Sequence, residues 1–267
     1  MKTPMIICGA AGRMGRTLLA LVAQHPDATV HGAVEAPGHA SIGQDAGEQA
    51  GVGHLGVAIV SDFEAVVTPE AVTLDFTTPA ATLEHLRAAV AKKGPMVIGT
   101  TGFEGAEQRE LDALAAQTRT VIAANMSVGV NVLLRLVDLA ARALGDAFDP
   151  EILELHHRMK VDAPSGTALA LARAVAAALG RDLQTEARYG RHGIVGRRTE
   201  REIGIVALRG GDAVGDHTVF FTGMGERLEL THRAQSRDCL ARGAIRAALW
   251  LVKQPASRYS MADVLGL

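Results

Sequence analysis

The sequence of 267 residues has few aromatic side chains, two cysteines and almost no excess of charge. Phe, Trp and Tyr make up only 3% of it, so its core must be built mainly from Ala, Val, Leu and Ile. The 27 Lys and Arg nearly balance the 29 Asp and Glu, which disfavours nucleic-acid and membrane-surface binders because both usually need a basic excess. Cys8 and Cys239 are too few for a secreted disulfide framework, and no apolar run approaches the roughly 20 residues of a membrane helix. We therefore expect a globular, cytoplasmic protein with no nucleic-acid or membrane partner.

Short apolar runs alternate with helix-length blocks through the first half of the chain. The runs lie at 5–8, 29–35, 57–60, 72–76, 96–98 and 120–123, and the predicted helices at 13–25, 79–93 and 104–117. Strands that alternate with helices of this length predict parallel βαβ units in a doubly wound α/β sheet. Residues 36–56 carry six glycines and few large apolar side chains, so we expect a long loop there.

The second half of the chain has a different pattern. It predicts helices at 129–144 and 165–179, a strand at 151–155, and a polar, arginine-rich loop at 181–201. Three β-type runs follow at 203–208, 217–222 and 227–231, and the short glycine-containing connections between them favour antiparallel hairpins. Ser236 can cap a last helix that places Leu240, Ala244, Ala248 and Leu251 on one face.

A glycine-rich turn follows the first predicted strand and opens the first helix, and it reads Gly9-Ala10-Ala11-Gly12-Arg13-Met14-Gly15. Its glycines allow a tight turn and close approach to a pyrophosphate, which the helix N-terminus then attracts. Glu35 ends the next strand, where a carboxylate accepts hydrogen bonds from ribose hydroxyls and repels a 2′-phosphate. Because Ala36 offers no cation, we predict a dinucleotide site that prefers NADH or uses both NADH and NADPH. A purely structural turn is the alternative.

Two further polar turns lie at the carboxyl ends of predicted strands, the edge at which open α/β sheets bind ligands. They are Gly99-Thr100-Thr101-Gly102 and Ala124-Asn125-Met126-Ser127. Because the same residue types populate ordinary turns, their spacing alone leaves ligand binding and turn formation equally open.

The segment 154–167 concentrates groups that can bind an anion and transfer a proton. It contains His156, His157, Arg158 and Lys160, and it ends in a helix start formed by Ser165, Gly166 and Thr167. A helix N-terminus with a hydroxyl and free amides binds anions, and a histidine suits proton transfer near neutral pH. In an extended chain the two histidines would point to opposite faces, so using both on one ligand requires the strand to end or twist there.

Three other interpretations of this segment are weaker. Adjacent histidines with only distant cysteines do not match zinc spacing, so we expect no metal. A Ser-His hydrolase would need G-x-S-x-G, which is absent from the sequence. A basic loop without a ligand is the third. Seven histidines outside the segment are expected to be surface or structural residues: 31, 39, 54, 85, 192, 217 and 232. Of these, His232, beside Arg233 and Arg237, is the most open to a functional role.

Taken in order, these motifs resemble the 4-hydroxy-tetrahydrodipicolinate reductase (dihydrodipicolinate reductase) family over essentially the whole chain. The matching segments are GAAGRMGR at 9–16, DFTTP at 75–79, GTTGF at 99–103, ANMSVGVN at 124–131 and ELHHRMKVDAPSGTAL at 154–169. The resemblance implies a Rossmann-type domain of residues 1–126 and 236–267 and an α+β mixed-sheet domain of residues 127–235. The second domain would bind substrate and build a homotetramer. The implied reaction is hydride transfer from NAD(P)H to a cyclic dicarboxylate in lysine and diaminopimelate biosynthesis.

The resemblance also implies a role for each motif residue. His156 would be the general acid/base and Lys160 a proton donor, while His157, Ser165, Gly166 and Thr167 would hold the substrate. The cofactor would contact Gly9, Ala10, Ala11, Gly12, Arg13, Met14, Glu35, Gly99, Thr100, Thr101, Ala123, Ala124, Asn125 and Met126. Ala36 departs from the family, many members of which have an arginine there. Another nicotinamide enzyme, such as an amino-acid dehydrogenase, and a catalytically silent NAD-binding sensor are the competing functions.

Overall fold

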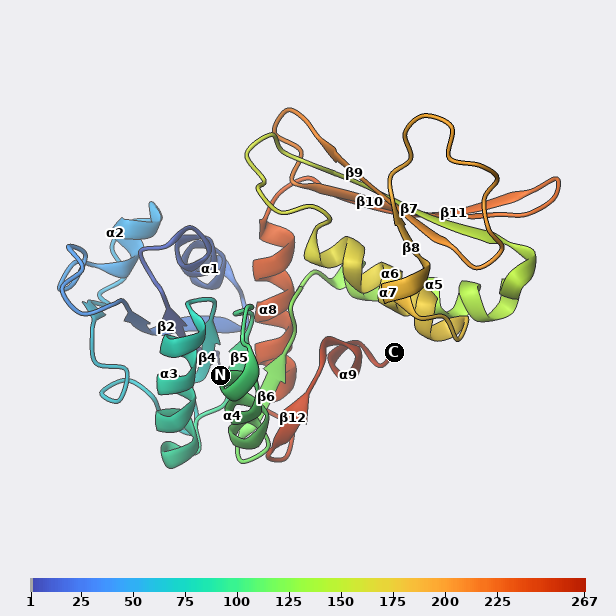
Figure 1. The fold of residues 1–267 in the computed structure, drawn as a ribbon. Helices are drawn as coiled ribbons and strands as arrows, with labels where there is room; N and C mark the ends of the chain where they lie inside the picture. The colour runs from blue at the N-terminus through green and yellow to red at the C-terminus, as the bar shows by residue number, and fades with distance from the viewer. Residues whose placement is uncertain (1) are drawn as a thin grey trace. The chain divides into compact units, whose positions relative to one another are not determined.

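The structure is a computed structural model that describes residues 2–267 (Figure 1). It divides into two compact units, one formed by the chain up to Val128 together with Asp238–Gly266, and the other by Gly129–Arg237. Each unit has its own sheet and its own hydrophobic core. No helix in the described part of the chain is long and apolar enough to cross a membrane.

A seven-stranded parallel sheet forms the centre of the first unit, in the order β12-β6-β5-β4-β1-β2-β3. The strands are β1 (Thr3–Cys8), β2 (Ala28–Val34), β3 (Ile59–Val60), β4 (Val72–Asp75), β5 (Met96–Ile98), β6 (Arg119–Ile122) and β12 (Ser257–Tyr259). The strand order reverses beside β1, which is the switch point of a doubly wound fold. The predicted Rossmann-type α/β fold is therefore confirmed.

The helices of this unit begin and end at recognisable signals. They are α1 (Arg13–Gln24), α2 (Ala46–Ala50), α3 (Pro79–Lys92), α4 (Gly105–Ala115), α8 (Asp238–Leu251) and α9 (Met261–Leu265). Leu18, Leu19 and Val22 of α1 are fully buried, as the helical spacing of its apolar residues predicts. Thr78 caps α3 and is followed by proline, whose fixed φ suits the first helical position.

The helix α8 lies so close to the chain after β6 that only glycine fits at one position. A Cβ atom on Gly243 would overlap the carbonyl oxygen of Met126. The helix begins at Asp238, and its buried face includes Ala244, Ala248 and Leu251, whereas the predicted Leu240 is only half-buried. The strand β12 and the helix α9 that follow were not predicted, because each is too short to show a periodic pattern.

The glycine-rich segment 36–56 is more ordered than the predicted loop, because it contains α2. The carboxylate of Asp45 accepts backbone N–H groups from Gly47 and Glu48 at the start of α2. It also accepts those of Leu55, Gly56 and Val57, between 2.7 and 3.1 Å away. These hydrogen bonds lower the pKa of Asp45 to about 2, against the opposing effect of burial.

The second unit contains a mixed five-stranded sheet in the order β11-β10-β7-β9-β8. Its strands are β7 (Asp149–His156), β8 (Ala187–Tyr189), β9 (Ile203–Arg209), β10 (Gly215–Thr222) and β11 (Arg227–Ala234). Its helices are α5 (Val128–Leu144), α6 (Gly166–Ala178), α7 (Leu183–Glu186) and the short 3-10 helix η1 (Gly145–Ala147). This arrangement confirms the predicted α+β mixed sheet.

Two predictions for this unit are wrong. β9 and β10 do not form a hairpin, because β7 lies between them, parallel to β9 and antiparallel to β10. Only β10 and β11 form the expected antiparallel hairpin. The predicted loop 181–201 contains α7 and β8, which pairs with β9.

The two faces of the second sheet differ in how they are covered. Ile152, Val219 and Phe221 are buried on one face in a core that includes residues of α5 and α6. The helices of the unit lie on this side of the sheet (Figure 1). The alternating register places a second apolar set on the opposite face, and its members are half-buried or exposed: Leu153, Leu155, Val206, Leu208 and Phe220.

Replacing Gly243 by alanine should destabilise the first unit by about 1–3 kcal/mol, because the added methyl group forces α8 away from Met126. Trp250, the single tryptophan, lies in α8, so its fluorescence can follow urea unfolding of this unit. The exposed Arg246→Ala in the same helix is the control and should leave the midpoint nearly unchanged. Equal midpoints for the two variants would contradict the close packing.

Candidate active site

A cavity of about 620 Å³ lies at the carboxyl ends of β1, β2 and β4 in the first unit. The glycine-rich turn after β1 lines it through Gly9 and Gly12, and Glu35 and Ala36 after β2 line it as well. Phe76, Thr77 and Thr78 follow β4 in the same wall, and Phe63 and His85 lie further along the cavity lining. The edge that the alternating pattern predicted to bind a ligand therefore has room for one.

The glycine-rich turn has the geometry of a phosphate cradle. Gly9 has a φ of +69°, and a Cβ atom on Gly15 would overlap the carbonyl oxygen of Gly9, so α1 packs directly onto the turn. Gly12 precedes α1, whose N-terminus carries free N–H groups and the positive end of the helix dipole. Glu35 reaches the turn, since its Oε2 accepts the N–H of Ala11 at 2.9 Å.

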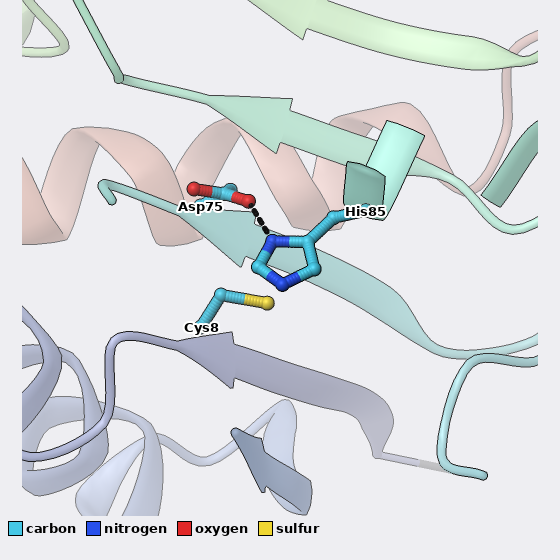
Figure 2. Close-up of side chains that lie close together, drawn as sticks. All are labelled: Cys8, Asp75 and His85. Carbon is cyan, nitrogen blue, oxygen red and sulfur yellow. Dashed lines mark hydrogen bonds and ion pairs between the residues drawn. The ribbon is translucent and has the colours of Figure 1, made fainter. Parts of the chain in front are cut away.

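The buried carboxylate of Asp75 lies at the end of β4, beside residues that line this cavity. Asp75 is fully buried and accepts hydrogen bonds from Thr77 and Thr82, and its Oδ2 lies 2.7 Å from Nδ1 of His85 (Figure 2). Burial raises the pKa of Asp75, but His85 and Thr77 outweigh it, so the carboxyl remains charged. His85 was predicted to be a surface or structural residue, and it is a structural residue that also lines the cavity.

Cys8 lies beside this pair (Figure 2). Burial, followed by the charges of Asp75 and Glu35, raises the pKa of its thiol well above the usual value. The thiol is thus protonated at neutral pH, as is typical of a buried strand residue and not of a nucleophile. Possible ligand atoms of Cys8, Asp75 and His85 lie within 4.8 Å of one another, yet the Asp75 oxygens already accept hydrogen bonds and the thiol keeps its proton.

The two other predicted turns lie at the same sheet edge, after β5 and β6. Gly99 approaches the ring of Phe76 so closely that a Cβ atom would overlap it. Thr100 is buried, and its hydroxyl oxygen lies 2.8 Å from that of Thr82, so its side chain belongs to the Asp75 network. Thr101 and Ala124 are exposed, whereas Ala123 and Asn125 are half-buried and Met126 is buried.

The second unit holds the segment 154–167 at the end of β7. The strand ends at His156, and the chain then turns, with the N–H of Lys160 donating to the carbonyl of His157 at 3.1 Å. The condition for both histidines to reach one ligand, that the strand ends there, is met. His156 is only 8% exposed, and Nζ of Lys160 pairs with Asp162 at 2.8 Å.

The N-terminus of α6 completes this site. Ser165 is the N-cap, and its hydroxyl accepts the N–H of Ala168 at 3.2 Å. Gly166 is exposed, with open space where a Cβ atom would lie, and Thr167 is half-buried. The exposed start of α6 therefore gives an anion access to the positive end of the helix dipole.

Two residues near His156 were not predicted to take part. Glu154 is fully buried, and its Oε2 lies 2.5 Å from Nδ1 of His156. Its Oε1 accepts the N–H of Ser165 and one N–H of Arg209, both at 3.0 Å. His217 of β10 is also buried and lies 3.1 Å from the hydroxyl of Ser165.

The sequence carried a signal for only one of these two residues. Glu154 alternates with Ile152 and His156, which places it on the core face of β7 and so identifies it as a carboxylate needing partners. His217 lies 61 positions beyond His156, and only the pairing of β10 with β7 brings it opposite Glu154.

Comparisons with known proteins give one consistent family. The family model described as "Dihydrodipicolinate reductase, N-terminus" matches residues 3–126, and "Dihydrodipicolinate reductase, C-terminus" matches residues 129–265. The 4-hydroxy-tetrahydrodipicolinate reductase of Geobacter metallireducens is 52% identical over 98% of both chains. That of Saccharophagus degradans is 50% identical over the whole of both chains. A dipicolinate-bound dihydrodipicolinate reductase from Paenisporosarcina sp. TG-14 has the same fold, with a TM-score of 0.76, 22% identity and coverage of 98% of this chain and 99% of that one.

Proposed function

The chain belongs to the dihydrodipicolinate reductase family, and we propose that its first unit binds the nucleotide and its second unit binds and protonates the substrate. The reaction is the NAD(P)H-dependent reduction of 4-hydroxy-tetrahydrodipicolinate to tetrahydrodipicolinate, a step of lysine and diaminopimelate biosynthesis. The main support for this division of roles is that His156, buried at the end of β7, lies in the same unit as the exposed start of α6.

The first unit has a cradle that fits a pyridine dinucleotide. The glycine-rich turn, through Gly9, Ala10, Ala11, Gly12, Arg13 and Met14, is proposed to hold the pyrophosphate at the N-terminus of α1. The residues after β5 and β6 are proposed to complete the site: Gly99, Thr100, Thr101, Ala123, Ala124, Asn125 and Met126. When bound, the reduced nicotinamide supplies the hydride.

Glu35 supports a preference for NADH or the use of both cofactors. Its carboxylate already lies at the turn, where it would accept hydrogen bonds from the ribose hydroxyls and repel a 2′-phosphate. The adjacent Ala36 is exposed on the cavity wall and brings no positive charge to offset that repulsion.

In the second unit, His156 and Lys160 are proposed to deliver the proton that the reduction requires. Loss of water from the 4-hydroxy substrate leaves a conjugated imine. Hydride addition to this imine develops negative charge on the ring, and an acid held at that position neutralises it. Burial lowers the pKa of His156, but a bound dicarboxylate raises it again because opposite charges favour the protonated form. His157, Ser165, Gly166 and Thr167 are proposed to hold the carboxylates through charge and backbone N–H groups.

We further infer that the enzyme is a homotetramer assembled through the second sheet. The face that carries Leu153, Leu155, Val206, Leu208 and Phe220 has these apolar side chains half-buried or exposed among polar ones and has no helix of the same unit over it. An apolar sheet face of this kind is stabilised by burial against another surface. A second copy of the chain presents a self-complementary partner for it.

Substitution of His156 by glutamine, or of Lys160 by methionine, should lower kcat by roughly 10²–10⁴, because the acid that neutralises the developing charge is lost. The measurement is the loss of nicotinamide absorbance, with substrate formed in situ from aspartate semialdehyde and pyruvate. The exposed His192→Gln is the control and should retain the native kcat. Native kcat in both site variants would reject the assignment.

The native enzyme should use NADH with a kcat/KM at least equal to that for NADPH. Introducing a cation by Ala36→Arg should raise kcat/KM for NADPH about tenfold, because a charge-assisted hydrogen bond to the 2′-phosphate becomes available. Ala113→Arg adds the same charge on the exposed surface of α4 and should change neither value. A large native advantage for NADPH would overturn the proposed preference.

Light scattering during size-exclusion chromatography should give a mass of four chains. Phe220→Glu, which places a charge on the uncovered sheet face, should yield smaller species because the charge would be buried on assembly. Leu139→Glu changes a more exposed apolar position on α5 and should preserve the native mass. A monomeric native chain would refute the tetramer.

A further inference from the structure

A carboxylate without access to water lies between the proposed acid and the proposed anion site. Glu154 is fully buried, and its pKa is nonetheless lowered: burial raises it, but hydrogen bonds from Ser165 and Arg209 and the neighbouring His156 outweigh the burial. A buried charge is costly unless every oxygen finds a partner. The partners of the Glu154 carboxylate therefore indicate what this buried charge contributes.

The two oxygens of Glu154 have different partners. Oε1 accepts the N–H of Ser165, the N-cap of α6, and it also accepts an N–H of Arg209. Oε2 lies 2.5 Å from Nδ1 of His156 and 4.0 Å from Nε2 of His217. A carboxylate oxygen only accepts hydrogen bonds, so the short contact favours the proton on Nδ1 and leaves Nε2 as the atom that exchanges a proton with substrate.

The remaining charged and titratable groups around His156 come from three elements. Lys160 follows β7, Arg209 ends β9 and His217 lies on β10, with its ring edge-on to that of His156 at 5.1 Å between centroids. Burial, followed by His156, lowers the pKa of His217 to about 4, so this second imidazole stays neutral at working pH. Lys160 and Arg209 disfavour the imidazolium, whereas the adjacent carboxylate of Glu154 favours it.

We propose that Glu154 is a positioning residue that fixes the tautomer and charge of His156 through Oε2 while it anchors the start of α6 through Oε1. The inference rests on the proposed role of His156 as the proton donor. The same carboxylate then fixes the His156 ring relative to the backbone N–H groups at the start of α6, as the carboxylate of a hydrolase triad orients its histidine.

The substitution Glu154→Gln separates the two roles. The amide oxygen can still accept from Ser165 and Arg209, but the amide NH₂ must face Nδ1 of His156 and forces the ring proton onto Nε2. The loss of the negative charge also lowers the pKa of His156, so the fall of kcat with rising pH should begin about one unit lower. We expect kcat at the optimum to fall about 10²-fold, with KM for substrate changed less than about threefold.

A readout that is independent of activity is the tautomer itself. Two-bond ¹H–¹⁵N correlation of the histidine rings, with His156 assigned from the spectrum of His156→Gln, should show Nδ1–H in the native enzyme and Nε2–H in Glu154→Gln. Glu154→Asp restores the negative charge, so its kcat should begin to fall at the same pH as that of the native enzyme. The double variant Glu154→Gln/His156→Gln should be no slower than His156→Gln, since Glu154 acts through the histidine.

Glu202→Gln is the matched control, because Glu202 is a nearly buried carboxylate that pairs with Arg191. It directly precedes β9, at the end of the strand opposite to Arg209. The variant should retain the native pH profile and the native His156 tautomer. If Glu154→Gln keeps the native His156 tautomer and the native pH dependence of kcat while His156→Gln is impaired, the positioning role of Glu154 alone is overturned. A fully active His156→Gln would instead overturn the proposed function of the histidine.

Discussion

Charge that is shut away from water must be paired, and each unit of this protein is organised around one such group. Asp75 at the end of β4 and Glu154 near the end of β7 are both fully buried, and each contacts Nδ1 of a histidine. Both also accept hydrogen bonds from a neighbouring helix or turn, Asp75 from Thr82 and Glu154 from Ser165. The carboxylates thereby tie strand ends to the segments that carry the proposed binding groups.

The same local design recurs at both proposed sites. A buried strand ends, the chain turns, and a helix begins with its N–H groups approachable: β1 leads to α1 through Gly12, and the chain after β7 leads to α6 through Ser165. Such an end attracts anions without a net positive charge on the protein. A chain whose acidic and basic residues nearly cancel can in this way offer the two anion sites proposed above.

The first sheet and the motif positions were predictable, because the periodicity that marks parallel strands and the glycine turn are local properties of the sequence. The strand order of the second sheet was not, since β7 inserts between β9 and β10 through pairing across more than 50 residues. The same pairing hid His217, which becomes a neighbour of Glu154 only in the folded sheet. Elements of three or four residues, such as α7 and β8, are too short to carry a readable period.

The hydrogen bonds of Asp45 stabilise a segment of the first unit that is distinct from the residues lining the cavity. They anchor the segment from Gly47 to Val57, whereas Ala36 and Pro37, which line the cavity proposed for the nucleotide, contribute no side chain to that anchor. Substitutions at these two positions therefore leave the anchor intact. If the cavity holds the nucleotide as proposed, a single substitution there can change cofactor preference without loosening the Asp45 anchor.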